Sequence, residues 1–205
     1  LTSLRYHVYD KTDVGVEQMA AALAADFKGY EELQYQFVYK TPKYGNDDDY
    51  ADKQEVEVFD LYYDVLNGHK SPRGANYRVN MLPTTCHVYF GSVTGATPDG
   101  RNAGKPLSEG ISPVQGADTK GPTAVIKSAA KIDHIKTGGT LLNQKFTPSL
   151  LATEQGATNL VHLIRAYFRM DGHHIQFNVV NADTLRDAQK HPENYTDLIV
   201  RVAGY

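Results

Sequence analysis

The sequence predicts an α/β fold, and three observations support this. Helical and extended patterns alternate over the C-terminal half, which favours α/β over an all-helical fold. Hydrophobic residues make up 41% of the chain and charged residues 22%, close to the averages of globular proteins. The 205 residues have the length of one domain, and no low-complexity linker divides them. We therefore expect residues 1–205 to form one domain.

Two helices are expected in the N-terminal part. Over residues 14–27 apolar side chains recur every three or four positions, Asp13 caps the start and Gly29 stops the helix. The second helix spans residues 48–66, where the carboxylates of Asp47, Asp48 and Asp49 complement the positive end of the helix dipole.

The middle of the chain is expected to contain fewer regular elements. A polar loop over residues 67–78 leads into an extended segment, 79–93, because Tyr89, Phe90 and Val93 favour a strand. Glycines and prolines are dense over residues 91–119, which predicts a long structured loop. Pro122 fits the first turn of a helix over residues 121–131.

Alternating elements follow. The expected strands and helices are strand 141–146, helix 156–170, strand 174–180, helix 182–190 and an extended segment 198–202. On the strand 174–180, Gln176 and Asn178 share a face with His174, whereas Ile175 and Phe177 point to the other side.

Composition and charge exclude several classes of function. A net charge of −3 with scattered Lys and Arg gives no basic stripe for nucleic acid. There is no apolar run long enough to span a membrane and no signal peptide at the start. The single cysteine, Cys86, forms no internal disulfide, in agreement with a reducing compartment. We expect a cytoplasmic protein, and we expect Cys86 to be a small buried side chain rather than a nucleophile.

The end of the chain, Arg201-Val202-Ala203-Gly204-Tyr205, is its most informative motif. Glycine has no Cβ, so its Cα can flatten. After loss of a hydrogen atom, the unpaired electron at that Cα is shared between the amide nitrogen on one side and the carbonyl on the other. Gly204 is therefore a candidate for storing a radical, although a turn glycine at a frayed terminus has the same local sequence.

Further segments resolve that choice. The segments are Pro42-Lys-Tyr-Gly-Asn-Asp-Asp-Asp-Tyr-Ala-Asp52, Thr97-Pro-Asp-Gly-Arg101, Glu109-Gly-Ile-Ser-Pro-Val-Gln-Gly116, Thr137-Gly-Gly-Thr-Leu-Leu-Asn-Gln-Lys-Phe146 and Asp171-Gly-His-His-Ile-Gln-Phe-Asn-Val-Val180. In this order and spacing, the chain closely resembles the glycyl radical enzymes, in the dehydratase and lyase branch related to pyruvate formate-lyase. The strongest likeness is to hydroxyproline and diol dehydratases and choline lyases.

The resemblance implies a fold and a chemistry. The family folds as a ten-stranded α/β barrel, and this chain is expected to be its C-terminal part, with residues 195–205 beginning the radical loop. An activating enzyme that uses S-adenosylmethionine and an iron–sulfur cluster takes a hydrogen atom from Gly204, so the chain itself binds no metal or cofactor. Arg201, Val202 and Tyr205 match the motif and are expected to position the loop, while His174, Gln176 and Asn178 are candidates for lining the barrel.

The resemblance also shows what this chain lacks. The family attacks its substrate with a cysteine thiyl radical in a Cys-x-Glu loop, and no Glu stands two residues after Cys86. The family also continues beyond the Gly-Tyr pair. We therefore expect a C-terminal piece of a larger enzyme, truncated at both ends and inactive alone. Its expected partners are the activating enzyme, a small-molecule substrate, the remainder of the same polypeptide and, as a candidate, a second copy in a homodimer.

Other interpretations have less support. His173 and His174 are adjacent on a strand and point to opposite faces, so a structural role is favoured over a metal site. Nucleotide-binding, calcium-binding and serine-hydrolase motifs are missing. The alternatives that stay open are a non-catalytic carrier of the glycyl radical and a part of a formate acetyltransferase-type enzyme.

Overall fold

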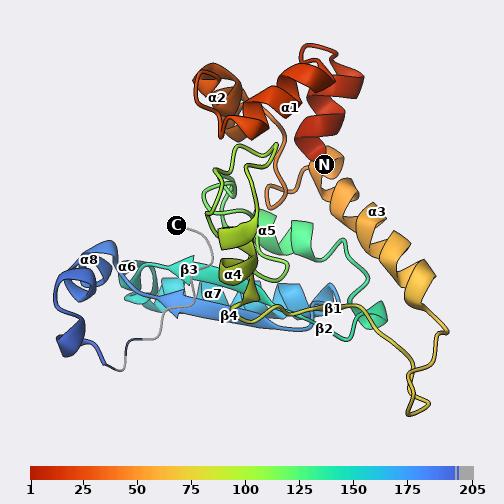
Figure 1. Cartoon of the computed structure of the whole chain (residues 1–205). Helices are drawn as coiled ribbons and strands as arrows, with labels where there is room; N and C mark the ends of the chain where they lie inside the picture. Colours follow the sequence, from red (N-terminus) through yellow and green to blue (C-terminus); the bar gives the residue numbers. More distant parts are fainter. Residues whose placement is uncertain (197, 199–205) are drawn as a thin grey trace.

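The computed structural model describes residues 1–196 and 198, and it combines helices with short parallel strands. Helices α1 and α2 lie together at one end of the molecule, and β3, β4 and α7 lie at the other (Figure 1). The helices are α1 (Val16–Ala24), α2 (Glu31–Tyr39), α3 (Asp49–Leu66), α4 (Cys86–Val93), α5 (Pro122–Ala129), α6 (Pro148–Leu151), α7 (Glu154–Arg169) and α8 (Ala182–Lys190). The strands are β1 (Asn80–Met81), β2 (Gly139–Thr140), β3 (Leu142–Phe146) and β4 (Ile175–Val179).

Three shorter helical turns complete the described elements. A π-helical turn, η1, covers Leu4–Asp10, and two 3₁₀ turns, η2 and η3, cover His134–Lys136 and Pro192–Asn194. No helix in the described part of the chain is both long enough and apolar enough to cross a membrane.

The helices and strands with a clear periodic pattern were predicted well. Helix α3 begins after Asp48, whose side chain accepts hydrogen bonds from Tyr50 N and Ala51 N at 3.0 and 3.4 Å, as an N-cap does. Pro122 opens α5 as expected. The predicted elements 141–146, 156–170, 174–180 and 182–190 correspond to β3, α7, β4 and α8.

The prediction for residues 79–93 was wrong over most of its length. Only Asn80 and Met81 form a strand; Thr84 then turns the chain with a φ of 56°, and α4 follows. The aromatic and β-branched residues that favoured a strand lie exposed on this helix, because α4 packs through Gly91 and His87 instead. Cys86, expected to be buried, is exposed at the first position of α4.

The N-terminal region also differs from its prediction. Helix α1 ends at Ala24, before the expected Phe27, because Asp26 and Phe27 take positive φ angles of 50° and 60°. A separate helix, α2, follows and was not predicted. The extended segment expected over 198–202 lies outside the described residues, apart from Leu198.

The strands form two parallel pairs that share one continuous stretch of chain. Asn80 and Met81 of β1 pair with Gly139 and Thr140 of β2, and Leu142–Phe146 of β3 pair with Ile175–Val179 of β4. Only Leu141 separates β2 from β3. A short segment, residues 109–112, runs beside this stretch: Ile111 N donates to Leu141 O at 3.0 Å, and Asn143 N donates to Ser112 Oγ at 2.9 Å.

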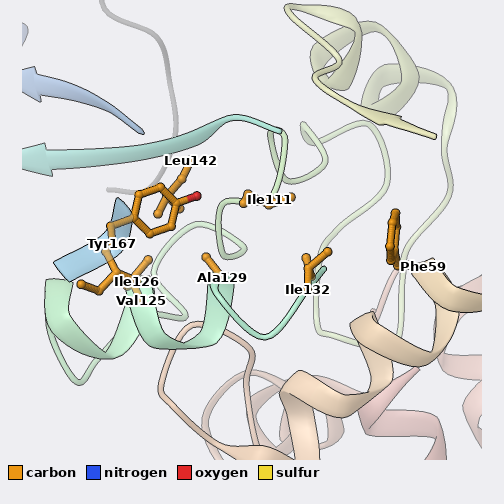
Figure 2. Packing of buried hydrophobic residues seen from close by; sticks show 8 residues of the cluster. All are labelled: Phe59, Ile111, Val125, Ile126, Ala129, Ile132, Leu142 and Tyr167. Atoms are coloured by element: carbon orange, nitrogen blue, oxygen red, sulfur yellow. The ribbon is translucent and has the colours of Figure 1, made fainter. Parts of the chain in front are cut away.

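The main core lies between the strands and the helices α3, α5 and α7 (Figure 2). Its buried members are Phe59, Ile111, Val125, Ile126, Ala129, Ile132, Leu142 and Tyr167. A second cluster connects α1 and α2, and Leu4 and Val8 of η1 pack against it. Its buried members are Val14, Met19, Ala22, Phe27, Leu33 and Phe37. The amphipathic helices therefore stabilise the fold mainly by burying apolar surface.

A charge cluster around the buried Asp52 connects the start of α3 to the residues just after α5. Lys131 Nζ donates to both Asp49 and Asp52 at 2.7 Å, and Asp52, fully buried, also accepts from Ser128 Oγ at 2.9 Å. Burial works to lower the pKa of Lys131, but the hydrogen bonds to Asp49 and Asp52 raise it above its ordinary value. Lys131 therefore stays charged, and removing it would leave a buried carboxylate without its cation.

The long loop over residues 94–121 is ordered by side chains that bind backbone. The Asn46 amide donates to Ala117 O at 2.7 Å and accepts from Thr119 N and Lys120 N at 2.8 and 3.1 Å. Arg101 Nη1 donates to Asn102 O and Lys105 O. The expectation of a structured loop is confirmed for this segment.

Gly91 is the point where α4 meets the long loop, and it gives a test of this packing. A Cβ at Gly91 would overlap Lys105 O and lie 2.6 Å from Pro106 Cα and 2.9 Å from Leu107 N, all backbone atoms. In the whole protein, we expect Gly91→Ala to lower the free energy of unfolding by roughly 1–3 kcal/mol, although alanine favours helix. Urea unfolding measures this.

Gly95→Ala is the matched control, because a Cβ at Gly95 meets nothing within 4 Å. If the Gly91→Ala variant were as stable as the Gly95→Ala variant, this result would contradict the close contact between α4 and residues 105–107.

Candidate active site

The β3–β4 pair has one face covered by helices and one polar face. Leu142 of β3 packs in the core with Tyr167 of α7, so this side of the strand faces the helices. The alternate residues point to the other side. The parallel register sets Asn143 beside Gln176 and Lys145 beside Asn178. We call these four residues the polar face.

The sequence had singled out only part of this face. Gln176 and Asn178 lie in β4 as expected, and Asn178 is buried with 8% exposure. His174 directly precedes β4, where its carbonyl accepts from Leu142 N at 3.1 Å and its side chain is exposed. Asn143 and Lys145 were missed. The alternation of side chains along the predicted strand 141–146 indicated that Asn143 and Lys145 share one face of that strand. A single sequence does not show which strand lies beside it.

A buried carboxylate lies against the polar face. Glu109 is 3% exposed and Asn143 is 4% exposed, and Asn143 Nδ2 donates to Glu109 Oε2. This bond fixes the amide, with its NH2 group toward the carboxylate and its oxygen away from it. The close approach depends on Gly110, whose φ is +57° and whose missing Cβ leaves room for Leu141 O.

The histidines have structural surroundings. His134 is buried, with Nε2 at 2.8 Å from Ala129 O and Nδ1 at 2.9 Å from Thr140 Oγ1. Desolvation lowers the pKa of His134, which favours the neutral ring. His173 lies beside it, with the ring centroids 5.5 Å apart. Among residues 1–196 and 198, no group of three His, Cys, Asp or Glu side chains could hold a metal ion.

A cavity of about 380 Å³ lies between α3 and the segment 108–117. Glu55 and Tyr44 contribute to its lining, and Tyr44 OH donates to Ile111 O at 2.8 Å. Desolvation raises the pKa of Glu55 to about 8, opposed by a hydrogen bond from Tyr44 and reinforced by the nearby Asp52. Glu55 is therefore largely protonated at neutral pH.

The structure does not describe the terminal motif. Arg201, Val202, Gly204 and Tyr205 lie outside the described residues, as does most of the segment 195–205 expected to begin the radical loop.

Comparison with known proteins connects these features to a family. A model described as "Glycine radical" matches residues 107–205, and one described as "Pyruvate formate lyase-like" matches residues 1–91. Trans-4-hydroxy-L-proline dehydratase of Clostridioides difficile is 58% identical over 205 residues, which are 100% of this chain and 26% of that protein.

Solved structures agree with the sequence matches. The crystal structure of hydroxyproline dehydratase from Clostridioides difficile aligns with a TM-score of 0.95 and 57% identity over 98% of this chain and 26% of that one. The B12-independent glycerol dehydratase from Clostridium butyricum aligns with a TM-score of 0.92 and 44% identity over 98% of this chain and 26% of that one. The chain thus spans about a quarter of these relatives and has the fold of a C-terminal portion of their α/β barrel.

Glu55 gives a test by pH. Its pKa is about 8 in the folded chain and has an ordinary value of 4.5, so between these values the folded state binds more protons than the unfolded state. The free energy of unfolding should therefore fall with rising pH across this window, by up to about 1.4 kcal/mol per pH unit, and this loss should be complete above pH 8. Urea unfolding of the whole protein at a series of pH values measures the slope.

Glu55→Gln should remove this contribution to the slope. Glu57→Gln, an exposed position on the same helix, should keep it. Equal slopes in the Glu55→Gln variant and the wild type would contradict the burial of a protonated Glu55.

Proposed function

The chain belongs to the glycyl radical enzymes of the pyruvate formate lyase-like family, and we propose that it is the C-terminal part of a radical dehydratase or lyase. The substrate would be a small hydroxylated molecule that loses water or another leaving group. The match of the "Glycine radical" model to residues 107–205, which include Gly204, is the observation that carries this proposal. Dehydratases and sulfite-lyases among the similar proteins support the reaction class.

Gly204 stores the radical in this proposal. An activating enzyme with S-adenosylmethionine and an iron–sulfur cluster removes one hydrogen atom from its Cα, and the spin spreads over the two neighbouring peptide groups. Arg201, Val202 and Tyr205 position the loop that begins in residues 195–205. The chain binds no cofactor of its own.

The chemical steps conserve atoms and electrons. A cysteine outside this chain passes a hydrogen atom from its thiol to Gly204, and the resulting thiyl radical takes a hydrogen atom from a substrate carbon. The hydroxyl on the neighbouring carbon, or another leaving group, departs with its bonding electron pair, and a protonated glutamate donates the proton that makes water of the hydroxyl. The group at the radical carbon then gives up one proton, which returns the glutamate to its protonated form and leaves a neutral product radical. The thiol then returns a hydrogen atom to the product radical, and Gly204 returns one to the thiyl.

The polar face supports a role in lining the reaction space. Gln176 and Asn178 are on the strand surface opposite the one that packs against the helices, which in an α/β barrel is the interior surface, and His174 directly precedes their strand. The side-chain amides of Gln176 and Asn178 both donate and accept hydrogen bonds, which suits hydroxyl groups. We assign them to the lining of the barrel.

The proposed assembly follows from the assignment of this chain as the C-terminal part of a glycyl radical enzyme. Residues 1–205 form part of one barrel domain, the rest of the polypeptide supplies the cysteine loop, and this segment alone is inactive. The activating enzyme and a small-molecule substrate are the partners, a homodimer is the proposed assembly, and the compartment is an oxygen-free cytoplasm.

The radical assignment is tested by electron paramagnetic resonance. After anaerobic activation of the whole protein, we expect a doublet, because the remaining hydrogen on the Gly204 Cα splits the signal. Gly204→Ala should abolish the doublet, whereas Gly95→Ala, at an open position, should keep it. A doublet that persists in Gly204→Ala would exclude this residue as the radical site.

The reaction class is tested with the activated whole protein and three compounds named for its relatives: trans-4-hydroxy-L-proline, glycerol and 1,2-propanediol. We expect a dehydrated product from at least one of them, detected by mass spectrometry as loss of water. A full radical signal without turnover of any of the three would count against a dehydratase of small hydroxylated substrates and favour a radical carrier.

A further inference from the structure

The cavity between α3 and the segment 108–117 is separate from the polar face. Its walls include Phe59, Val79 and Met81, which belong to the main core or pack against it. Leu142 of that core points away from the polar face. The cavity therefore lies in the layer of helices, and the chemical steps proposed above make no use of it.

Two side chains of α3 bring polar groups without partners to this cavity. Gln54 Nε2 and Glu55 Oε2 are buried, and neither has a hydrogen-bond partner in the part of the chain that the structure describes. A buried polar atom without a partner costs about 1–3 kcal/mol. The Gln54 amide nitrogen is a donor, and the Glu55 carboxyl is a donor when protonated, a form that burial favours by raising its pKa to about 8. Both groups thus require acceptors, such as the carbonyl group of a peptide bond.

Apolar side chains extend the cavity along α3. Val58 and Tyr62 line it, and Leu61 and Val65 lie next to them, because residues three and four apart are neighbours on a helix. We call these four residues the apolar row. Leu61, Tyr62 and Val65 are 63%, 59% and 62% exposed. A contiguous exposed row of large apolar side chains marks a surface that packs against further protein.

The first residues of the chain indicate what covers this surface. Leu1 and Thr2 line the same cavity, and the N-terminus lies beside the start of α3 (Figure 1). Leu1 O accepts from Arg5 N at 2.9 Å, so the main chain is fixed there. Consecutive Cα atoms are about 3.8 Å apart, so a residue that precedes Leu1 in a longer polypeptide starts at the cavity wall. The relatives have the length for such a segment, since this chain spans 26% of trans-4-hydroxy-L-proline dehydratase.

We propose that the polypeptide preceding Leu1 in the whole protein fills this cavity and packs along the apolar row, with its peptide carbonyl groups accepting hydrogen bonds from Gln54 and Glu55. This inference rests on the proposed function, which makes residues 1–205 part of a longer polypeptide. A second copy of the chain would also bury the apolar row, but the covalent connection at Leu1 gives the preceding segment a far higher effective concentration at the cavity. The apolar row is thus an interface within one polypeptide.

Photo-crosslinking in the whole protein tests the occupant. We expect p-benzoylphenylalanine in place of Tyr62 to crosslink, on irradiation, to a peptide within about 15 residues before Leu1, because even a helical segment of that length, at 1.5 Å per residue, covers the apolar row. Mass spectrometry of the digested protein identifies the peptide. The same replacement at Tyr89, an exposed tyrosine of α4, is the matched control and should not capture this peptide.

Three results at position 62 would overturn the inference. They are a crosslink to a second copy of the protein, a crosslink to a more distant peptide, and no crosslink to protein, as expected of a cavity that holds water alone.

Hydrogen exchange gives an independent measurement. Val58→Asp places a carboxylate in the cavity wall and should speed amide exchange in the peptide before Leu1 by on the order of 10- to 100-fold. Exchange in α7 should keep its rate, which shows that the fold is intact. Unchanged exchange before Leu1 would contradict the packing, and the crosslink, which needs no destabilising substitution, decides if the variant unfolds.

The outcome separates this inference from the proposed function. The expected crosslink in a protein that forms no radical at Gly204 would keep the packing and reject the radical role. A Gly204 radical in a protein whose position 62 crosslinks elsewhere would keep the radical role and reject the packing.

Discussion

Leu142 and Asn143 are neighbours in β3 and both are buried, so the chain has to cover an apolar and a polar side of one strand. The apolar side is covered by α5 and α7, whose side chains close the main core. The polar side needs hydrogen-bonding partners, because a buried amide without them is destabilising. Glu109 and Ser112 supply two of these partners. Burial of both sides of β3 therefore requires helices on its apolar side and hydrogen-bonding groups on its polar side.

The same constraint explains why the segment 109–112 lies where it does. It lies within the long loop, which Arg101 orders before this segment and Asn46 orders after it, and Gly110 lets its backbone approach Leu141 closely. Parallel pairing then brings Gln176 and Asn178 to the same side as Asn143 and Lys145. Polar side chains from three distant parts of the sequence, namely the segment 109–112, β3 and β4, thus lie on one surface. The helices pack on the opposite side of these strands.

Local sequence patterns predicted the helices and strands that have a clear hydrophobic period of their own. The sequence periods of α3, α7 and β4 were sufficient to predict these three elements. The prediction for residues 79–93 was wrong because strand-favouring side chains there remain exposed on α4, whose contacts involve His87 and Gly91. Burial of Cys86 was inferred from apolar neighbours that are themselves exposed.

The candidate site was predictable in part. Gln176 and Asn178 could be found because alternation within one strand reveals a shared face. Glu109 and Asn143 could not be joined from sequence, because their contact spans 34 positions and depends on the register of the loop against β3. The proposed role of Gly204 rests on family resemblance, since the physical properties of a terminal glycine alone do not distinguish radical storage from a turn.

Parallel pairing of β1 with β2 also has a kinetic consequence. Asn80 and Met81 meet partners at positions 139 and 140, so their hydrogen bonds cannot form until α4, the long loop and α5 have been synthesised. Such non-local contacts slow folding, since a long loop must close before they stabilise anything. During translation Val79 and Met81, which pack against the main core in the folded chain, emerge well before that closure. The nascent chain therefore keeps these apolar side chains in water until residues 139 and 140 have been made.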